Sequence, residues 1–221
     1  MGDRRAAKRR ILPRVALVVV AFLGTSGIVA VGLATGDPGH PPATKPRPSP
    51  SATPVRKVNL SKLPIARGPF CSLLPHSAAE QALGGPVTRT EQYGNGDNAT
   101  LAPGTSDVSH EFSCAFDAAD GSQARAWVFA PPVQTSEAAT LAAQARKERG
   151  CSPAKAPRFG TPTVATLCHE SSPKRNVVTL RGLFGSAWLS CQLTSADPAS
   201  QVEQRATQWC VTVATTLGAR P

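Results

Sequence analysis

Two adjoining stretches near the end of the chain decide the fold: residues 186–194, SAWLSCQLT, and residues 197–218, DPASQVEQRATQWCVTVATTLG. The first alternates, so that a β-strand would carry its apolar side chains on one face: Ala187, Leu189, Cys191 and Leu193. The second predicts a helix with Asp197 as N-cap, Pro198 in the first turn and Gly218 at its end. Its apolar stripe is Val202, Ala206, Trp209, Val213 and Leu217. We expect this helix to cover the apolar face of the strand.

The preceding sequence supplies further elements of both kinds. Residues 77–83 predict a helix that starts with a capping box, Ser77 and Glu80, and ends at Gly84. Residues 93–107, YGNGDNATLAPGTSD, predict a loop. Strands are expected at 110–117, 124–131, 162–170, 175–182 and 186–194, with a second helix from Ser136 to Gly150. The order α-β-β-α-β-β-β-α predicts an α+β domain with a mainly antiparallel sheet, one face of which the helices cover.

The N-terminus has the pattern of a membrane-targeting segment. Residues 1–14 form a basic tail with six Lys and Arg side chains against one Asp. Residues 15–34, VALVVVAFLGTSGIVAVGLA, are uncharged and long enough as a helix to span a bilayer core. The positive-inside bias places the tail in the cytoplasm and everything after Ala34 outside. We expect a single-pass signal anchor in the cell membrane; the alternative is cleavage near Ala34 and secretion.

A Pro-rich segment separates the anchor from the domain. Residues 35–69 contain nine prolines and predict an extended, disordered spacer, which leaves residues 70–221 for the extracytoplasmic domain. The formal net charge of +10 is confined to the tail and the spacer, because residues 70–221 hold twelve basic and twelve acidic side chains. The domain therefore lacks the positive charge on which nucleic-acid binding depends, and we expect no nucleic-acid partner.

Six cysteines lie beyond the apolar segment, and an exported chain meets an oxidising compartment where such cysteines pair. Six cysteines allow 15 connectivities. Orientation favours Cys71–Cys114 and Cys191–Cys210, because the strand cysteines face the expected core, and this leaves Cys151–Cys168. Cys71 lies far from the apolar segment and lacks a lipidation motif. Zinc ligation is disfavoured because no C-x-x-C pair exists, Cys168-His169 being the nearest approach.

No catalytic or cofactor motif is present in the sequence. The chain contains no phosphate-binding loop, dinucleotide fingerprint, G-x-S-x-G elbow or H-E-x-x-H. We therefore assign no catalytic, cofactor-binding or metal-ligating residue. The four histidines, which are His40, His76, His110 and His169, are expected at exposed edges. Trp127, Trp188 and Trp209 are interpreted as core residues, with a role in lining a ligand site as the alternative.

The domain resembles a family of exported proteins. Residues 71–85, CSLLPHSAAEQALGG, together with Cys114 in an aromatic strand and ARAWVFA at 124–130, resemble the Cys-containing actinobacterial domains of unknown function numbered 3558. The plan is also similar to that of the extracytoplasmic sensor domains of actinobacterial receptor kinases. The resemblance implies a disulfide-stapled α+β domain at the cell envelope, and it implies no reaction.

These observations predict a membrane-tethered extracytoplasmic binding or interaction module rather than an enzyme. Its expected partners are the cytoplasmic membrane and a cell-wall polymer, a small ligand or another envelope protein. Two alternatives stay open. One is an envelope hydrolase whose site is assembled only by folding, and the other is a purely structural envelope protein.

Overall fold

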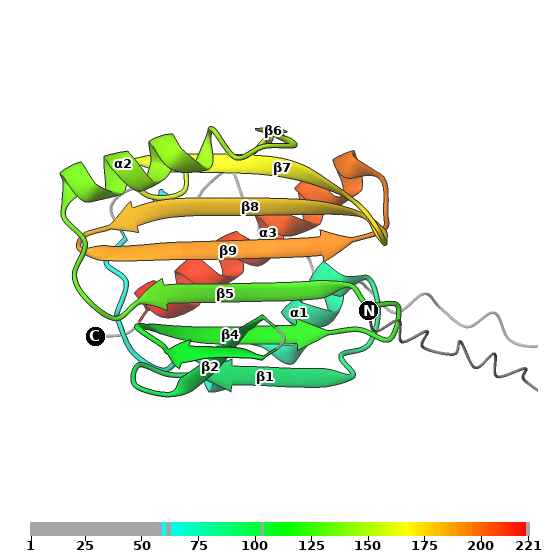
Figure 1. The fold of residues 1–221 in the computed structure, drawn as a ribbon, viewed down its shortest axis with the longest axis horizontal. Helices are drawn as coiled ribbons and strands as arrows, with labels where there is room; N and C mark the ends of the chain where they lie inside the picture. The colour runs from blue at the N-terminus through cyan, green and yellow to red at the C-terminus, as the bar shows by residue number, and fades with distance from the viewer. Residues whose placement is uncertain (1–58, 61–62, 103, 220–221) are drawn as a thin grey trace, which may run out of the picture. The chain divides into compact units, whose positions relative to one another are not determined.

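An antiparallel sheet of seven strands organises the folded part of the chain (Figure 1). The computed structural model describes residues 59–60, 63–102 and 104–219, so the predicted tail, the anchor and most of the spacer lie outside it. Across the sheet the strands are β1 (Arg89–Tyr93), β4 (Glu111–Asp117), β5 (Gln123–Phe129), β9 (Ala187–Ser195), β8 (Lys174–Phe184), β7 (Thr163–Ser171) and β6 (Cys151–Pro153). Every neighbouring pair is antiparallel. The predicted fold class, α+β with an antiparallel sheet, is confirmed.

Helices α1 (His76–Leu83) and α3 (Ala199–Gly218) pack on one face of the sheet, behind it in Figure 1. Every residue of the predicted apolar stripe of α3 is at most 1% exposed. These side chains meet the inward-facing residues of β9 and β8, Leu189, Leu193, Val178 and Leu180 among them, in one continuous core. We call this side of the sheet the closed face.

The prediction that the helices cover one face is wrong for α2 (Thr135–Ala145), which packs on the opposite face. Its alanines, Ala138 and Ala142 among them, contact Val164, Leu183 and Trp188, which alternate away from the closed face. The strands β7, β8 and β9 thus carry apolar side chains on both faces at one end, and each face needs its own cover. We call this second side, only part of which α2 covers, the open face.

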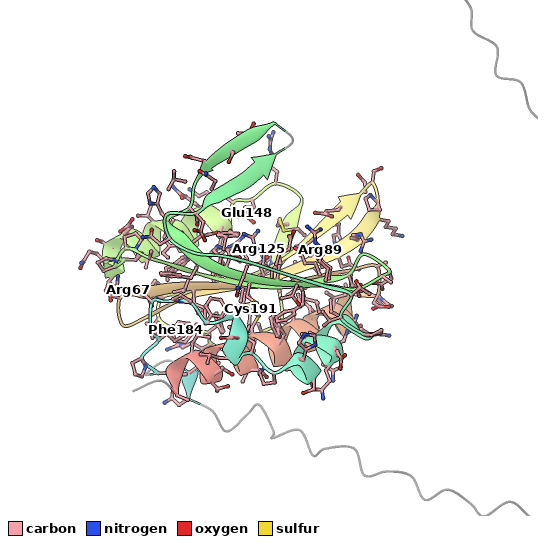
Figure 2. The ribbon with its side chains drawn as sticks, turned by 90° about the horizontal axis from the view of Figure 1, so that it is seen from below. Arg67, Arg89, Arg125, Glu148, Phe184 and Cys191 are labelled. Atoms are coloured by element: carbon pink, nitrogen blue, oxygen red, sulfur yellow. A yellow bond between two sulfur atoms is a disulfide. The ribbon has the colours of Figure 1, made fainter. Side chains whose placement is uncertain are left out.

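The predicted loop at 93–107 is wrong in part, because it contains a β-hairpin. Strands β2 (Asn98–Ala102) and β3 (Thr105–Val108) pair with each other as a separate two-stranded sheet. The hairpin rises from the open face, on the side opposite α1 and α3 (Figure 2). Strands β1 and β6 lie outside the predicted strands, since both are short and mostly exposed and so carry no apolar alternation.

The predicted helix caps differ from those in the structure. The N-cap residues of α1 and α3 are Pro75 and Pro198 rather than Ser77 and Asp197, that of α2 is Gln134, and none of the three makes a side-chain capping bond. Asp197 instead pairs with Arg205 and accepts a hydrogen bond from Ser195 at 2.8 Å. Gly84 does end α1 in the left-handed conformation, with a φ of 76°.

The folded part includes residues just before position 70. Leu60 and Ile65 are 3% and 8% exposed and belong to the closed-face core. Arg67 donates a hydrogen bond of 2.7 Å to the carbonyl of Ala130, beyond the end of β5. Within the described residues no helix combines the length and apolarity that crossing a bilayer requires, and the predicted anchor at 15–34 lies outside them.

Candidate ligand-binding site on the open face

The open face carries polar and aromatic side chains in rows that run across the strands. The sheet register places Tyr93 beside Ser113, Ser113 beside Trp127, and Trp127 beside Ser190. Residues that are register partners point to the same side of a sheet, so these four side chains share the open face. In Figure 2, Arg125 and Glu148 lie on this side, whereas Phe184 and Cys191 lie on the side of α1 and α3.

Arg125 of β5 is the centre of a polar cluster, which we call the Arg125 cluster. Its guanidinium lies over the Trp127 ring, 4.8 Å from the centroid, and 5.8 Å from the centroid of the Tyr93 ring. It forms an ion pair with Glu111 at 3.5 Å, and its Nε donates to Ser113 Oγ at 3.3 Å. A guanidinium stacked on rings and held by a carboxylate keeps one orientation.

Tyr93 closes this cluster through its phenol. The hydroxyl accepts a hydrogen bond from Arg125 and donates one to Glu111. Burial raises the pKa of Tyr93, the hydrogen bond to the Glu111 carboxylate raises it further, and the Arg125 charge opposes both. Tyr93 is therefore a protonated hydrogen-bond donor at neutral pH. The groups of the cluster thus supply hydrogen-bond and ion-pair partners to one another.

A pocket of about 490 Å³ opens beside this cluster. It lies where five elements meet: the end of β1, the end of β3, β4, the end of β5, and the first turn of α2. Its lining combines apolar and acidic side chains: Tyr93, Val108, Phe129 and Pro131 with Asp107, Glu111 and Glu137, together with Ser109 and His110. The volume falls in the range of roughly 300–1,000 Å³ that is typical of small-ligand sites. We call this the β3–α2 pocket.

Val108 gives this pocket an exposed apolar wall. Its side chain is 46% exposed, and only one other large hydrophobic residue among those described is comparably open, Leu73 at 40%, which directly precedes Leu74 of the closed-face core. Hairpin β2–β3 therefore carries apolar surface at the site without burying it.

A second pocket, of about 450 Å³, lies at the other end of α2 and has the opposite charge. Arg146 and Arg158 line it together with β6 and β7, and no acidic side chain takes part. Arg146 is already engaged, because it donates to the carbonyl of Thr163 at 2.9 Å. The two pockets flank α2, with the acidic one at its N-terminal end and the basic one at its C-terminal end.

The structure contains three disulfides, Cys71–Cys114, Cys151–Cys168 and Cys191–Cys210, the pairs that the sequence favoured. Cys114, Cys191 and Cys210 are fully buried in the closed-face core. Cys151 and Cys168 are directly opposed on β6 and β7, half-buried and on the open face. The predicted disulfide character of the domain is thus confirmed.

Glu148 comes close to the sulfur atoms of Cys151 and Cys168, so the three residues together have the composition of a metal site. The two sulfurs are bonded to each other, however, and a disulfide is not a thiolate ligand. Glu148 instead pairs with Arg181 at 3.1 Å. No residue here is assigned to a metal.

The other residues considered in the sequence analysis lie apart. His76 packs against Phe116 with ring centroids 5.7 Å apart, and His169 Nδ1 lies 2.6 Å from Asn176 Oδ1; His40 is outside the described residues. Of the three histidines that the structure describes, His110 is the one that lines the β3–α2 pocket. Trp188 and Trp209 are core residues, at 2% and 1% exposure, whereas Trp127 is half-buried in the Arg125 cluster.

Sequence reasoning missed Arg125, Tyr93 and Glu111 as a group. The available signal was alternation, since ARAWVFA places Arg125, Trp127 and Phe129 on the face that Cys114 and Phe116 avoid. Comparison of the sequence with known protein families and with curated proteins finds no match to either.

Proposed function

We propose that this chain is a membrane-tethered extracytoplasmic binding module of the cell envelope, and that it takes its ligand on the open face. The supporting observation is the β3–α2 pocket, a concave site of about 490 Å³ beside the pre-organised Arg125 cluster. A rigid set of aromatic and charged groups at the mouth of a pocket lowers the ordering cost of binding. On the closed face of the described residues, α1 and α3 cover the strands and bury their apolar side chains.

The tether is proposed from the sequence. Residues 15–34 would anchor the chain, the Pro-rich residues would hold the domain away from the bilayer, and the six paired cysteines fit an oxidising compartment. In cells expressing the full chain, protease added to spheroplasts should digest the domain without lysis. Protection of the domain until lysis would contradict the proposed location.

The binding proposal is tested with the full chain reconstituted in nanodiscs and titrated with solubilised cell-wall polymer and other envelope fractions. Val108→Arg would block the pocket wall, and it should weaken binding by about tenfold or more, since a desolvated contact is replaced by an exposed charge. Leu73→Arg is the matched control, because Leu73 is comparably exposed but lies outside the pocket, next to Leu74 of the closed-face core. Equal binding by both variants and the unaltered chain would contradict the open-face site.

A hydrolase is the second candidate, because His110 lines the same pocket as three carboxylates. A His–carboxylate pair is a common general-base arrangement. Among the described residues, however, no hydrogen bond or ion pair joins the His110 ring to a carboxylate. Turnover of an envelope polymer that His110→Ala abolishes, while ligand binding persists, would favour the hydrolase over the binding module.

A further inference from the structure

We propose that the β3–α2 pocket selects an organic cation, specifically an alkylammonium group carried on an apolar stem. This proposal rests on the proposed function, in that it names the ligand class for the same site. Its basis is the chemistry of the lining, which combines apolar walls with an excess of negative charge and contains no Lys or Arg.

The negative charge is not neutralised within the described part of the protein. Glu111 pairs with Arg125, but Glu137 has no ion-pair or hydrogen-bond partner there. Asp107 accepts only the backbone N–H of Val108, at 2.8 Å. Asp107 on β3 and Glu137 on the first turn of α2, both exposed, therefore line a common pocket to which no basic side chain contributes.

The apolar part of the pocket decides what kind of cation fits. Phe129 and Pro131 lie at the end of β5 and just beyond it, and Val108 and Tyr93 also line the pocket. A hydrated metal ion gains nothing from such surface. An aliphatic stem, in contrast, removes its own apolar surface and that of the pocket wall from water, which favours binding. Aromatic side chains also stabilise an ammonium group when it lies over a ring face.

The basic pocket at the other end of α2 serves as an internal comparison. The two cavities have similar volumes, about 490 and 450 Å³, and of these two the β3–α2 pocket is the one that combines carboxylates with aromatic rings. The surface of one molecule thus offers two pockets of similar size and opposite charge. Charge complementarity therefore predicts that a positively charged ligand binds in the β3–α2 pocket rather than in the basic pocket.

The test uses the full chain in nanodiscs of zwitterionic lipid, so that the bilayer does not attract the probes. Isothermal titration compares hexylammonium with two probes of nearly the same shape, hexanol and hexanoate. We expect saturable binding of hexylammonium at least about tenfold tighter than that of either comparison probe, because only the ammonium makes charge-assisted hydrogen bonds with the carboxylates. Binding of hexanol or hexanoate as tight as that of hexylammonium would overturn the proposal.

Glu137→Gln should weaken hexylammonium binding by about threefold to tenfold, with the larger effect at low salt. Glu170→Gln is the control, since Glu170 is an exposed carboxylate on β7 that lies outside the pocket. An unchanged affinity in Glu137→Gln, or an equal loss in Glu170→Gln, would contradict the assignment. Near-ultraviolet circular dichroism of both variants shows that the fold is retained.

Two further probes distinguish the sources of the ammonium group. 1,5-Diaminopentane represents a free amine, and a lysine blocked at both its amino and carboxyl ends represents the side chain of a peptide. If one of these two probes binds more tightly than the other, it identifies the source of the ammonium group and supports the proposal. If neither probe binds, the proposal is overturned. If envelope polymer still binds in a Val108-dependent manner while every cation fails, the binding function stands and the cation assignment falls.

Discussion

The two faces of the sheet differ in chemistry, because successive residues of one strand point to opposite sides. On the closed face, β4, β5, β8 and β9 present apolar side chains and the buried cysteines Cys114 and Cys191 to α1 and α3. On the open face β4 and β5, together with β1, present the Arg125 cluster, and α2 covers one end of the sheet. The difference indicates that the stability of this domain resides mainly on one side, which leaves the other side free to vary in chemistry.

The largest expected effect is on stability, from the same substitution made on each face. Trp209→Ala on the closed face should lower the free energy of unfolding by about 3–5 kcal/mol, as is typical for removing a fully buried aromatic side chain. Trp127→Ala on the open face should cost about 1 kcal/mol, because that ring is half-buried and packs against a guanidinium. Denaturant unfolding under oxidising conditions measures both. Equal losses would show that the faces contribute alike.

The next largest difference between the two faces is expected in how easily their disulfides are reduced. The Cys191–Cys210 and Cys151–Cys168 bridges close similar sequence separations, 19 and 17 residues, so restriction of the unfolded chain predicts similar contributions of about 2–4 kcal/mol. Their burial differs, and a dissolved thiol should reach the half-buried Cys151–Cys168 bridge first. Alkylation and mass mapping during mild reduction should label Cys151 and Cys168 while far-ultraviolet circular dichroism stays native. Earlier labelling of Cys191 and Cys210 would contradict this order.

A smaller effect is expected at Tyr93, which is the only tyrosine in the chain, so its phenolate absorbance reports one group. Its folded-state pKa is raised above 10.0, first by burial and then by Glu111. The stability linked to this shift is therefore present below pH 10.0 and is lost as the pH rises through the folded-state pKa. Glu111→Gln should lower the Tyr93 pKa, because it removes a carboxylate that favours the protonated phenol. A pKa that stays the same or rises in this variant would contradict the arrangement of the cluster.

The smallest effect is expected at Asp120, in the turn between β4 and β5. Its pKa is lowered, first by the hydrogen bond from the Ser122 backbone N–H at 2.8 Å and also by the Ser122 hydroxyl. The linked stability is present above its ordinary pKa and is lost as the pH falls through the lowered value. Asp120→Asn removes this titrating group and should therefore reduce the loss of unfolding free energy at acid pH. The effect should be small, because the Asp120 carboxylate is exposed. An acid limb identical to that of the unaltered chain would contradict this role.

The closed face was largely predictable from the sequence, and the open face was not. Periodicity located α3 and the strands β4, β5, β7, β8 and β9, and cysteines on apolar faces indicated which pairs could meet. Such signals are local, because they require only that alternate or every third and fourth residue be apolar. The placement of α2 depends instead on Trp188 and Leu183, which face away from the core of α1 and α3, and no local pattern states which face a helix takes.

The candidate site was beyond sequence reasoning for a related reason. Tyr93, Glu111 and Arg125 are separated by up to 32 positions, and only the register of β1, β4 and β5 brings them together. Glu137 lines the same pocket as Tyr93 and Glu111 because α2 packs on the open face, which the sequence did not predict. The sequence of hairpin β2–β3 predicts a loop because it is rich in Gly, Asn and Asp, although Val108 in the hairpin forms a wall of the pocket.

The central claim, that the open face is the binding surface, is tested most directly by hydroxyl-radical footprinting of the full chain. Labelling is compared between the protein in its native envelope and the same protein purified in nanodiscs. The account predicts that Tyr93, Trp127 and Val108 are protected in the envelope, while Leu73 and His76 on the opposite side are labelled equally in both samples. Protection confined to Leu73 and His76, or no protection on either face, would contradict it.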